Sequence, residues 1–425
     1  MWPKIINNFN KQSILKNNLV IAKYIILTTS RYFSNDNNNN NNLVKENEKE
    51  FLKKNDDDDN NINILNLIND AANFNEITNT SWSTTPYNSA GDRIALLCNN
   101  NEKKREKINP EDKTVFIFPG QGTLKVGAVE KYLIYPRVKK LFDIGNEILG
   151  YNILDICLNG PQSKLNKTEF NQPATILTSL AALEKIWEDN SFATENCIAA
   201  AGYSVGELTA LIFSGALTIE DGIRLAGIRG AGMQYAVDQE PNQGMLTVIS
   251  KHDTKISKAC QEARNFSINL GLSLPICQIA IYLCNETKVL AGHQQTLEYI
   301  INNSYNLNFR KVFKLQTVTG AFHTPLMKPA LKSFVKALDD IQFQEPRIPV
   351  YSNVTAKPYR SIKDIIHLLP KQIISPVKWE QIIHEIYKRP KGNNFPQTFD
   401  LGSNGTMKTI LRKINLSASD LCTFI

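Results

Sequence analysis

The stretch that decides the fold is Ala199-Ala-Ala-Gly-Tyr-Ser-Val-Gly-Glu-Leu-Thr-Ala-Leu-Ile-Phe213. Small and apolar residues lead into Gly202-Tyr-Ser-Val-Gly206, and apolar residues at helical spacing follow it. A strand, a sharp turn and a helix are the surroundings of a nucleophile elbow, because glycines permit a turn tight enough to lift the Ser204 hydroxyl out of the fold. A buried turn serine is the alternative that this motif alone leaves open.

Charge is unevenly distributed along the chain. Of its 425 residues, 48 are Lys or Arg and 41 are Asp or Glu, which gives a formal net charge of +7. Residues 1–35 contain basic residues and no acid, so the rest of the chain is nearly neutral. The basic balance therefore belongs largely to the N-terminal leader and does not indicate nucleic-acid binding.

Residues 1–34 resemble a mitochondrial presequence. They are rich in Lys, Asn, Ile and Leu, lack acids and end in Arg31-Tyr-Phe-Ser34, which looks like a processing signal. A signal peptide or membrane anchor is the alternative, but Lys23 interrupts an apolar run that is too short to span a bilayer. We therefore predict a mitochondrial matrix location and no membrane span. Residues 35–112 are Asn-rich and polar and are expected to be largely disordered.

The cysteines indicate a reduced protein without a metal site. The chain has seven of them, none in a C-x-x-C pair, and no Cys/His cluster has metal-ligand spacing. Reduced and mostly buried thiols are the expected state. We predict no metal and no cofactor.

The folded body is expected to begin with a buried strand. Thr114–Phe118 is a continuous apolar run, and Pro119-Gly-Gln-Gly122 follows it directly. The backbone N–H groups of this turn could face a bound oxygen, although an ordinary tight turn fits the same residues. Helices are predicted near residues 132–149 and 153–158, and a further helix is expected to begin at Pro173.

A second long helix follows the elbow. Thr218-Ile-Glu-Asp221 is a capping box, and the helix that it begins is expected to reach about Ala236. Arg229 lies near its middle among glycines, alanines and apolar residues, where a solvated charge is not expected. A buried structural ion pair and a ligand site are both compatible with this arginine.

The pattern of apolar residues changes within residues 244–318. Strand, helix, strand, strand, helix and strand patterns follow one another there, which is the ferredoxin-like order. The predicted fold class is therefore α/β: a hydrolase-like domain with a parallel sheet, formed by residues 113–243 and 319–425, into which a small ferredoxin-like βαββαβ subdomain is inserted.

His323 is the best candidate for a base among the five histidines. It is expected to end the exit strand of the insert, and Pro325 marks a helix directly after it. A lone histidine is more often structural, but a serine elbow upstream in the same chain favours a base.

The motifs together resemble the malonyl-CoA:acyl-carrier-protein transacylase family, in particular its mitochondrial type II members. The resemblance spans about residues 113–415. It rests on Phe118-Pro-Gly-Gln-Gly122, Gln172-Pro-Ala174, Gly202-Tyr-Ser-Val-Gly-Glu207, Arg229, Gly320-Ala-Phe-His323, Ser352-Asn-Val354, Ser375-Pro-Val-Lys-Trp379 and Gly402-Ser-Asn-Gly405, in family order.

The resemblance implies a two-step exchange at Ser204. This serine would take malonyl from coenzyme A as an ester, with His323 as general base and then as the acid for the leaving thiol. A backbone carbonyl orients the histidine in this family, and here it would come from Gln372. The backbone amides of Gln121 and Val205 would form the oxyanion hole.

Arg229 would supply the specificity of this reaction. Its guanidinium would hold the malonyl carboxylate with a two-pronged pair, whereas acetyl would leave it buried and unpaired. The implied partners are malonyl-CoA and acyl carrier protein, and we expect a monomer that supplies mitochondrial fatty acid synthesis.

Two other functions remain as alternatives. An α/β-hydrolase esterase also uses G-x-S-x-G, but it normally carries an acid between serine and histidine and explains neither the insert nor Arg229. A non-catalytic scaffold on the same fold would need none of Ser204, His323, Gln121 and Arg229.

Overall fold

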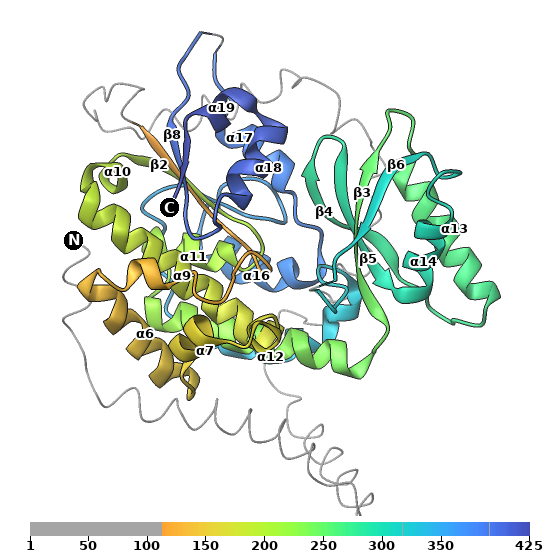
Figure 1. Ribbon diagram of the computed structural model, residues 1–425, viewed down its shortest axis with the longest axis horizontal. Helices are drawn as coiled ribbons and strands as arrows, with labels where there is room; N and C mark the ends of the chain where they lie inside the picture. The colour runs from red at the N-terminus through yellow and green to blue at the C-terminus, as the bar shows by residue number, and fades with distance from the viewer. Residues whose placement is uncertain (1–112, 317, 391) are drawn as a thin grey trace, which may run out of the picture. The chain divides into compact units, whose positions relative to one another are not determined.

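The computed structural model describes residues 113–316, 318–390 and 392–425 (Figure 1). All of these residues lie within Asn75–Ile425, one of the two units into which the chain divides. The predicted presequence, residues 1–34, and the segment predicted to be disordered, residues 35–112, lie outside the described residues. The six cysteines that the structure describes are free and buried.

One sheet among the described residues is parallel throughout. Its strand order is β7-β2-β1-β8-β9, and every neighbouring pair is parallel. All five residues of β1 are buried, as expected for a strand covered on both faces. The bounds of the strands are β1 Thr114–Phe118, β2 Cys197–Gly202, β7 Val350–Tyr351, β8 Gln397–Asp400 and β9 Cys422–Phe424.

Helices precede and follow a second, small sheet, which lies within residues 243–314 of the chain. Those before it are η5 Glu130–Tyr132, α6 Pro136–Leu149, α7 Ile153–Asn159, α8 Gln162–Leu165, α9 Thr168–Asp189, α10 Ser191–Glu195, α11 Gly206–Phe213 and α12 Ile219–Gln239. Those after it are η6 Pro325–Ala330, α15 Leu331–Asp339, α16 Ile362–Ile374, α17 Trp379–Ile386, α18 Thr406–Ile414 and α19 Leu416–Asp420. The long helix α9 packs against α12, α6 and α11 (Figure 1).

Helix α9 begins earlier than predicted. It starts at Thr168, so Pro173 lies inside the helix and does not begin it. A proline there cannot donate to the carbonyl of Glu169, four residues earlier. The Tyr151 hydroxyl donates to that carbonyl at 3.4 Å, which gives the freed oxygen a partner. The proline is thus tolerated because tertiary structure replaces the lost hydrogen bond.

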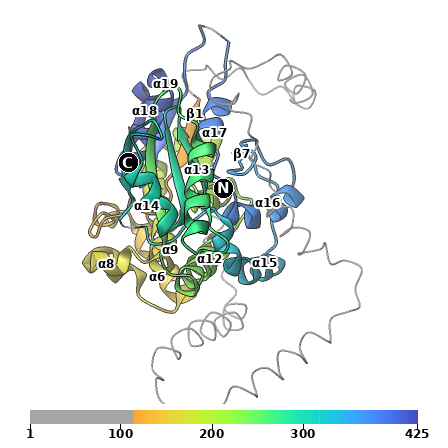
Figure 2. The ribbon, with the colours of Figure 1, turned by 90° about the vertical axis from the view of Figure 1, so that its right-hand side faces the viewer.

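The second sheet is antiparallel and has the order β4-β5-β3-β6. With α13 and α14 it follows the βαββαβ sequence of a ferredoxin-like unit, and both helices lie on one face of the sheet (Figures 1 and 2). A buried cluster that includes Leu246, Leu290 and Ile300 fills the space between them. The bounds are β3 Gln243–Ser250, α13 Ile256–Asn269, β4 Cys277–Cys284, β5 Thr287–His293, α14 Gln294–Asn302 and β6 Phe309–Lys314.

The exit from this unit differs from the prediction at His323. Strand β6 ends at Lys314, and His323 lies in a turn with a positive φ of 61°. The histidine therefore does not end a strand. The turn is held from the small sheet, because the Gln243 side chain accepts from the Ala321 N–H at 2.7 Å and Gln278 donates to the His323 carbonyl at 3.4 Å.

The elbow between β2 and α11 depends on the absence of a side chain at Gly202. A Cβ at this position would lie 1.9 Å from the backbone carbon and oxygen of Gly206. We therefore expect Gly202→Ala to lower the free energy of unfolding by more than about 3 kcal/mol, because the clash is with backbone atoms. Denaturant unfolding measures this effect.

Gly227→Ala is the matched control for Gly202→Ala. A Cβ at Gly227 would meet only the end of the Leu149 side chain, at 3.0 Å, and alanine favours the helical backbone of α12. This control should stay within about 1 kcal/mol of the parent. Equal stabilities of the two variants would contradict the account of the elbow.

Candidate active site

Ser204 lies at the tip of the turn between β2 and α11. Its φ is +54°, a conformation that costs a non-glycine residue energy and that the surrounding structure must hold. Asn353, which follows β7, holds it from both sides. Its side-chain oxygen accepts from the Ser204 N–H at 2.7 Å, and its side-chain nitrogen donates to the Gly202 carbonyl at 2.7 Å.

His323 contacts the serine directly. Its Nε2 lies 2.8 Å from Ser204 Oγ, and its Nδ1 lies 2.7 Å from the backbone oxygen of Gln372. A carbonyl can only accept, so Nδ1 carries the proton and Nε2 is free to accept the serine hydroxyl proton. The pair therefore has the geometry of a nucleophile and its general base.

Burial keeps His323 neutral. Together with the nearby Arg229 charge it lowers the pKa of His323 to about 3, while the hydrogen bond to the Gln372 carbonyl opposes the change. A histidine in the unfolded chain titrates near 6.5. The imidazole is therefore unprotonated at neutral pH, as a base must be before it acts.

This lowered pKa makes His323 a source of acid sensitivity. Because the unfolded state takes the proton first, the stabilisation is complete above about pH 6.5 and is lost as pH falls towards 3. From pH 7 to pH 5 this residue alone should cost about 2 kcal/mol of unfolding free energy. We expect the unfolding free energy of His323→Gln, measured with denaturant at the two pH values, to lack this part of the decrease. Equal losses in parent and variant would contradict the assignment.

Arg229 enters the same site from α12. Its guanidinium is buried and donates to Gln172 Oε1 at 2.6 Å, to Gln372 Oε1 at 2.8 Å and to Ser204 Oγ at 3.3 Å. Burial lowers its pKa to about 10, so the group stays charged at neutral pH. Among the described residues its partners are neutral groups and not a carboxylate within ion-pair distance. The interpretation as a structural ion pair is therefore not supported.

Val205 follows Ser204 directly in the chain, whereas Gln121 lies in the loop after β1. The loop after β1 lies against the elbow, since a Cβ on Gly120 would meet the Tyr203 ring at 2.6 Å and a Cβ on Gly206 would meet the Pro119 carbonyl at 2.5 Å. Within the part of the chain that the structure describes, neither the Gln121 N–H nor the Val205 N–H has a protein acceptor. Across these residues neither amide is committed to another acceptor, as an oxyanion-hole donor requires.

A profile of the acyl transferase domain family matches residues 115–390. The chain belongs to this family. A Drosophila melanogaster protein named "Probable malonyl-CoA-acyl carrier protein transacylase, mitochondrial" is 43% identical over 318 residues, which are 75% of this chain and 83% of that protein. The Homo sapiens protein named "Malonyl-CoA-acyl carrier protein transacylase, mitochondrial" is 42% identical over 313 residues, which are 74% of this chain and 80% of that protein.

Solved structures share the fold of this acyl transferase. One is a malonyl-transacylase in complex with its type II PKS acyl-carrier protein, with a TM-score of 0.65 and 26% identity over 73% of this chain and 94% of that one. The predicted fold class, a parallel α/β sheet with an inserted ferredoxin-like unit, is confirmed. The family resemblance drawn from the motifs is confirmed as well.

Three polar residues of this acyl transferase site have roles that the sequence did not predict. Gln172 binds Arg229, Asn353 holds the elbow, and Glu207 lies fully buried one turn after Ser204. Burial raises the pKa of Glu207 to about 7, although three hydrogen-bond donors oppose the change. All three lie within the sequence motifs that indicated the family. For Glu207, an acidic residue among the apolar residues of α11 was the feature that could have predicted a role in the site.

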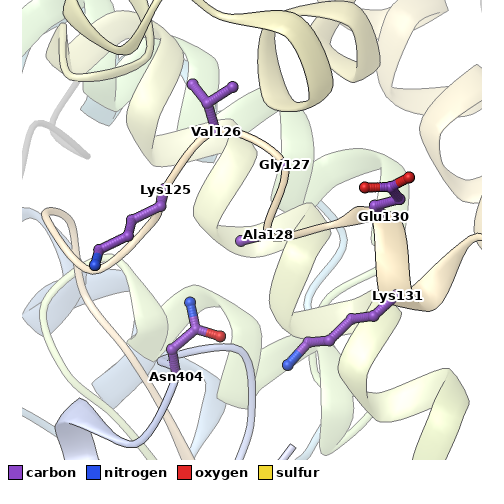
Figure 3. A pocket seen from close by; sticks show the side chains of 7 residues that line it. All are labelled: Lys125, Val126, Gly127, Ala128, Glu130, Lys131 and Asn404. Carbon is purple, nitrogen blue, oxygen red and sulfur yellow. The ribbon is translucent and has the colours of Figure 1, made fainter.

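A pocket is lined by residues of the segment after β1 and of the turn after β8. Figure 3 shows its lining, in which Lys131 and Asn404 come from opposite sides. None of the predicted site residues lines it, so we assign it no part in acyl transfer. Across the described residues, no three His, Cys, Asp or Glu side chains group as a metal site would require. No described helix has both the length and the apolar character needed to cross a membrane.

Proposed function

We propose that this acyl transferase moves the malonyl group from malonyl-CoA to the phosphopantetheine thiol of acyl carrier protein, through a malonyl ester on Ser204. The names of its relatives support the substrates, and a related structure binds an acyl-carrier protein. The Ser204 and His323 pair supports the ester intermediate.

The observation that carries this proposal is the short distance between Arg229 and Ser204. The guanidinium nitrogen lies 3.3 Å from the serine oxygen that would bear the acyl group. In malonyl a single methylene separates the acyl carbonyl from the carboxylate, so the cation that binds the carboxylate must lie beside the nucleophile. A planar guanidinium can take a carboxylate through two parallel hydrogen bonds.

In the first half-reaction, His323 Nε2 takes the hydroxyl proton as Ser204 Oγ attacks the thioester carbonyl. The oxygen of the tetrahedral intermediate accepts from the backbone amides of Gln121 and Val205. The carbon–sulfur bond then breaks, and the proton on Nε2 passes to the leaving coenzyme A thiolate. The ester and free coenzyme A are the products.

The second half-reaction is the same sequence in reverse, with the carrier thiol in place of coenzyme A. His323 takes the thiol proton, the thiolate attacks the ester, and the proton returns to Ser204. The low exposure of both side chains, 8% for Ser204 and 2% for His323, limits the access of water to the ester. Transfer is favoured over hydrolysis for that reason.

An esterase fits the site less well. Hydrolases of that class orient the histidine with an acid, whereas His323 Nδ1 faces the Gln372 carbonyl. A scaffold would not require the alignment of His323, Ser204 and a buried cation. The geometry therefore supports an acyl transferase that uses its site.

We also propose the cofactor requirement, the oligomeric state and the location of the enzyme. Acyl exchange between two thiols is redox-neutral, and Ser204 and His323 account for every bond and proton, so we propose no cofactor beyond the two substrates. We also propose that the enzyme acts as a monomer. The relatives are named as mitochondrial proteins, and the presequence-like leader supports the matrix.

Initial rates at varied malonyl-CoA and holo carrier protein test the function. A shared ester intermediate predicts parallel lines in double-reciprocal plots, with free malonate formed much more slowly than malonyl carrier protein. Intersecting lines would contradict the ester intermediate. Rapid malonate release without a carrier would favour the esterase.

A further inference from the structure

Glu207 is a fully buried carboxylate that the reaction above does not use. It lies in the first turn of α11, three residues after Ser204. Its Oε1 accepts from the Asn353 N–H at 3.1 Å and from the Tyr359 hydroxyl at 2.5 Å, and its Oε2 accepts from Gln372 Nε2 at 2.5 Å. All three partners are placed as donors, as a carboxylate requires.

Gln372 connects this carboxylate to Arg229. Its amide nitrogen donates to Glu207 Oε2 and, at 2.8 Å, to the Ser204 carbonyl, while its amide oxygen accepts from the Arg229 guanidinium at 2.8 Å. An amide between a carboxylate and a guanidinium has one favourable orientation, because the carboxylate needs a donor and the guanidinium needs an acceptor. The backbone oxygen of the same residue orients His323.

We propose that Glu207 is a positioning residue for malonyl recognition: its carboxylate fixes the side-chain amide of Gln372, which in turn holds Arg229 where the substrate carboxylate must bind. This inference rests on the proposed function, because Arg229 is given its substrate there. Glu207 does not touch the substrate and acts through Gln372. Glu207 forms no ion pair with Arg229, and the side chain of Gln372 links the two groups.

The isosteric change Glu207→Gln tests the orientation directly. The oxygen of the new amide belongs at the position of Oε1, where two donors meet it, so its NH2 group then faces the NH2 group of Gln372. Gln372 relieves that clash only by turning, which presents its NH2 group to the Arg229 guanidinium. Binding of a carboxylate should suffer, whereas an acyl group without a carboxylate does not depend on Arg229.

The experiment compares the acylation of Ser204 by malonyl-CoA and by acetyl-CoA, followed by intact mass. For Glu207→Gln we expect the malonyl-to-acetyl ratio of kcat/KM to fall at least tenfold, with acetylation close to the parent. Glu184→Gln is the matched control, because Glu184 is a buried helical glutamate outside the site. It should keep the parent ratio.

Gln372→Met is a second variant for the same test, to be used if Glu207→Gln does not fold. It removes both ends of the amide bridge but keeps the backbone carbonyl that orients His323, so it should lower the same ratio. A parent-like ratio in the folded variant, or equal losses with both thioesters, would overturn the positioning role. The parent separates the two proposals: if wild-type protein does not acquire malonyl at Ser204, the proposed function fails, whereas an unchanged ratio in an active enzyme defeats only this inference.

Discussion

Ser204→Ala is expected to lower kcat/KM for malonyl transfer by on the order of 10⁴-fold or more, because no ester can form without the hydroxyl. His323 Nε2 lies 2.8 Å from this oxygen and is placed to take its proton in the first half-reaction. The assay is the formation of malonyl carrier protein from malonyl-CoA and holo carrier protein, with initial rates measured at malonyl-CoA concentrations well below KM.

Ser214→Ala is the matched control for this variant. Ser214 is also buried and lies at the end of α11, where its hydroxyl donates to the Leu211 carbonyl at 2.9 Å. Its loss should cost about 1 kcal/mol of stability and leave turnover unchanged. Transfer by Ser204→Ala at more than about a hundredth of the parent rate would show that the reaction does not use this serine.

Arg229→Ala is expected to lower the malonyl-to-acetyl ratio of kcat/KM sharply. Loss of a buried, hydrogen-bonded charge pair costs about 2–5 kcal/mol, so kcat/KM for malonyl-CoA should fall by roughly 30-fold to several thousand-fold. Acetyl-CoA should lose much less, since acetyl has no carboxylate. Removal of the cation also strengthens His323 as a base, because Arg229 is one cause of its lowered pKa.

The structure corrects one expectation about this specificity. With acetyl, Arg229 was expected to remain without a partner, but Gln172 and Gln372 accept from its guanidinium within the fold itself. Discrimination therefore comes from the charge pair gained with malonyl and not from an orphaned cation. Because Arg229→Ala leaves both amide oxygens without this donor, turnover should be expressed per folded protein.

Arg224→Ala provides the control for that comparison. Arg224 lies on the same helix, where it pairs with Asp221 at 2.7 Å and is partly exposed. It should retain the parent malonyl-to-acetyl ratio. Arg229→Lys is not expected to restore that ratio, because an ammonium lacks the planar fork of the guanidinium. An Arg229→Ala enzyme that kept the parent malonyl-to-acetyl ratio would rule out Arg229 as the carboxylate site.

Periodicity and turn chemistry predicted much of this fold. Strand β1 has the predicted bounds, and Thr218 caps α12 by accepting from the Asp221 N–H. The ferredoxin-like order could be predicted because the spacing of apolar residues changes between strand and helix periods, and turn residues separate the segments. Pro173 misled because a proline usually begins a helix, and only tertiary structure places the Tyr151 hydroxyl at the freed carbonyl.

The site could be predicted in its members but not in its connections. The motifs singled out Ser204, His323 and Arg229, and the family resemblance implied Gln372. The structure brings these four together. The role of the Gln372 side chain could not be predicted from the sequence. It depends on Glu207 and Arg229, which are distant from Gln372 in sequence but contact the two ends of its amide. Short β7 and the positive φ of His323 are likewise set by contacts and not by a local pattern.

The most direct test of the central claim is the intact mass of the protein after mixing with malonyl-CoA, followed by mapping of the modified peptide. We predict one malonyl-sized increment, located on Ser204, absent from Ser204→Ala and lost when holo carrier protein is added. No increment on the wild-type protein, or an increment that persists in Ser204→Ala, would contradict the malonyl-serine mechanism.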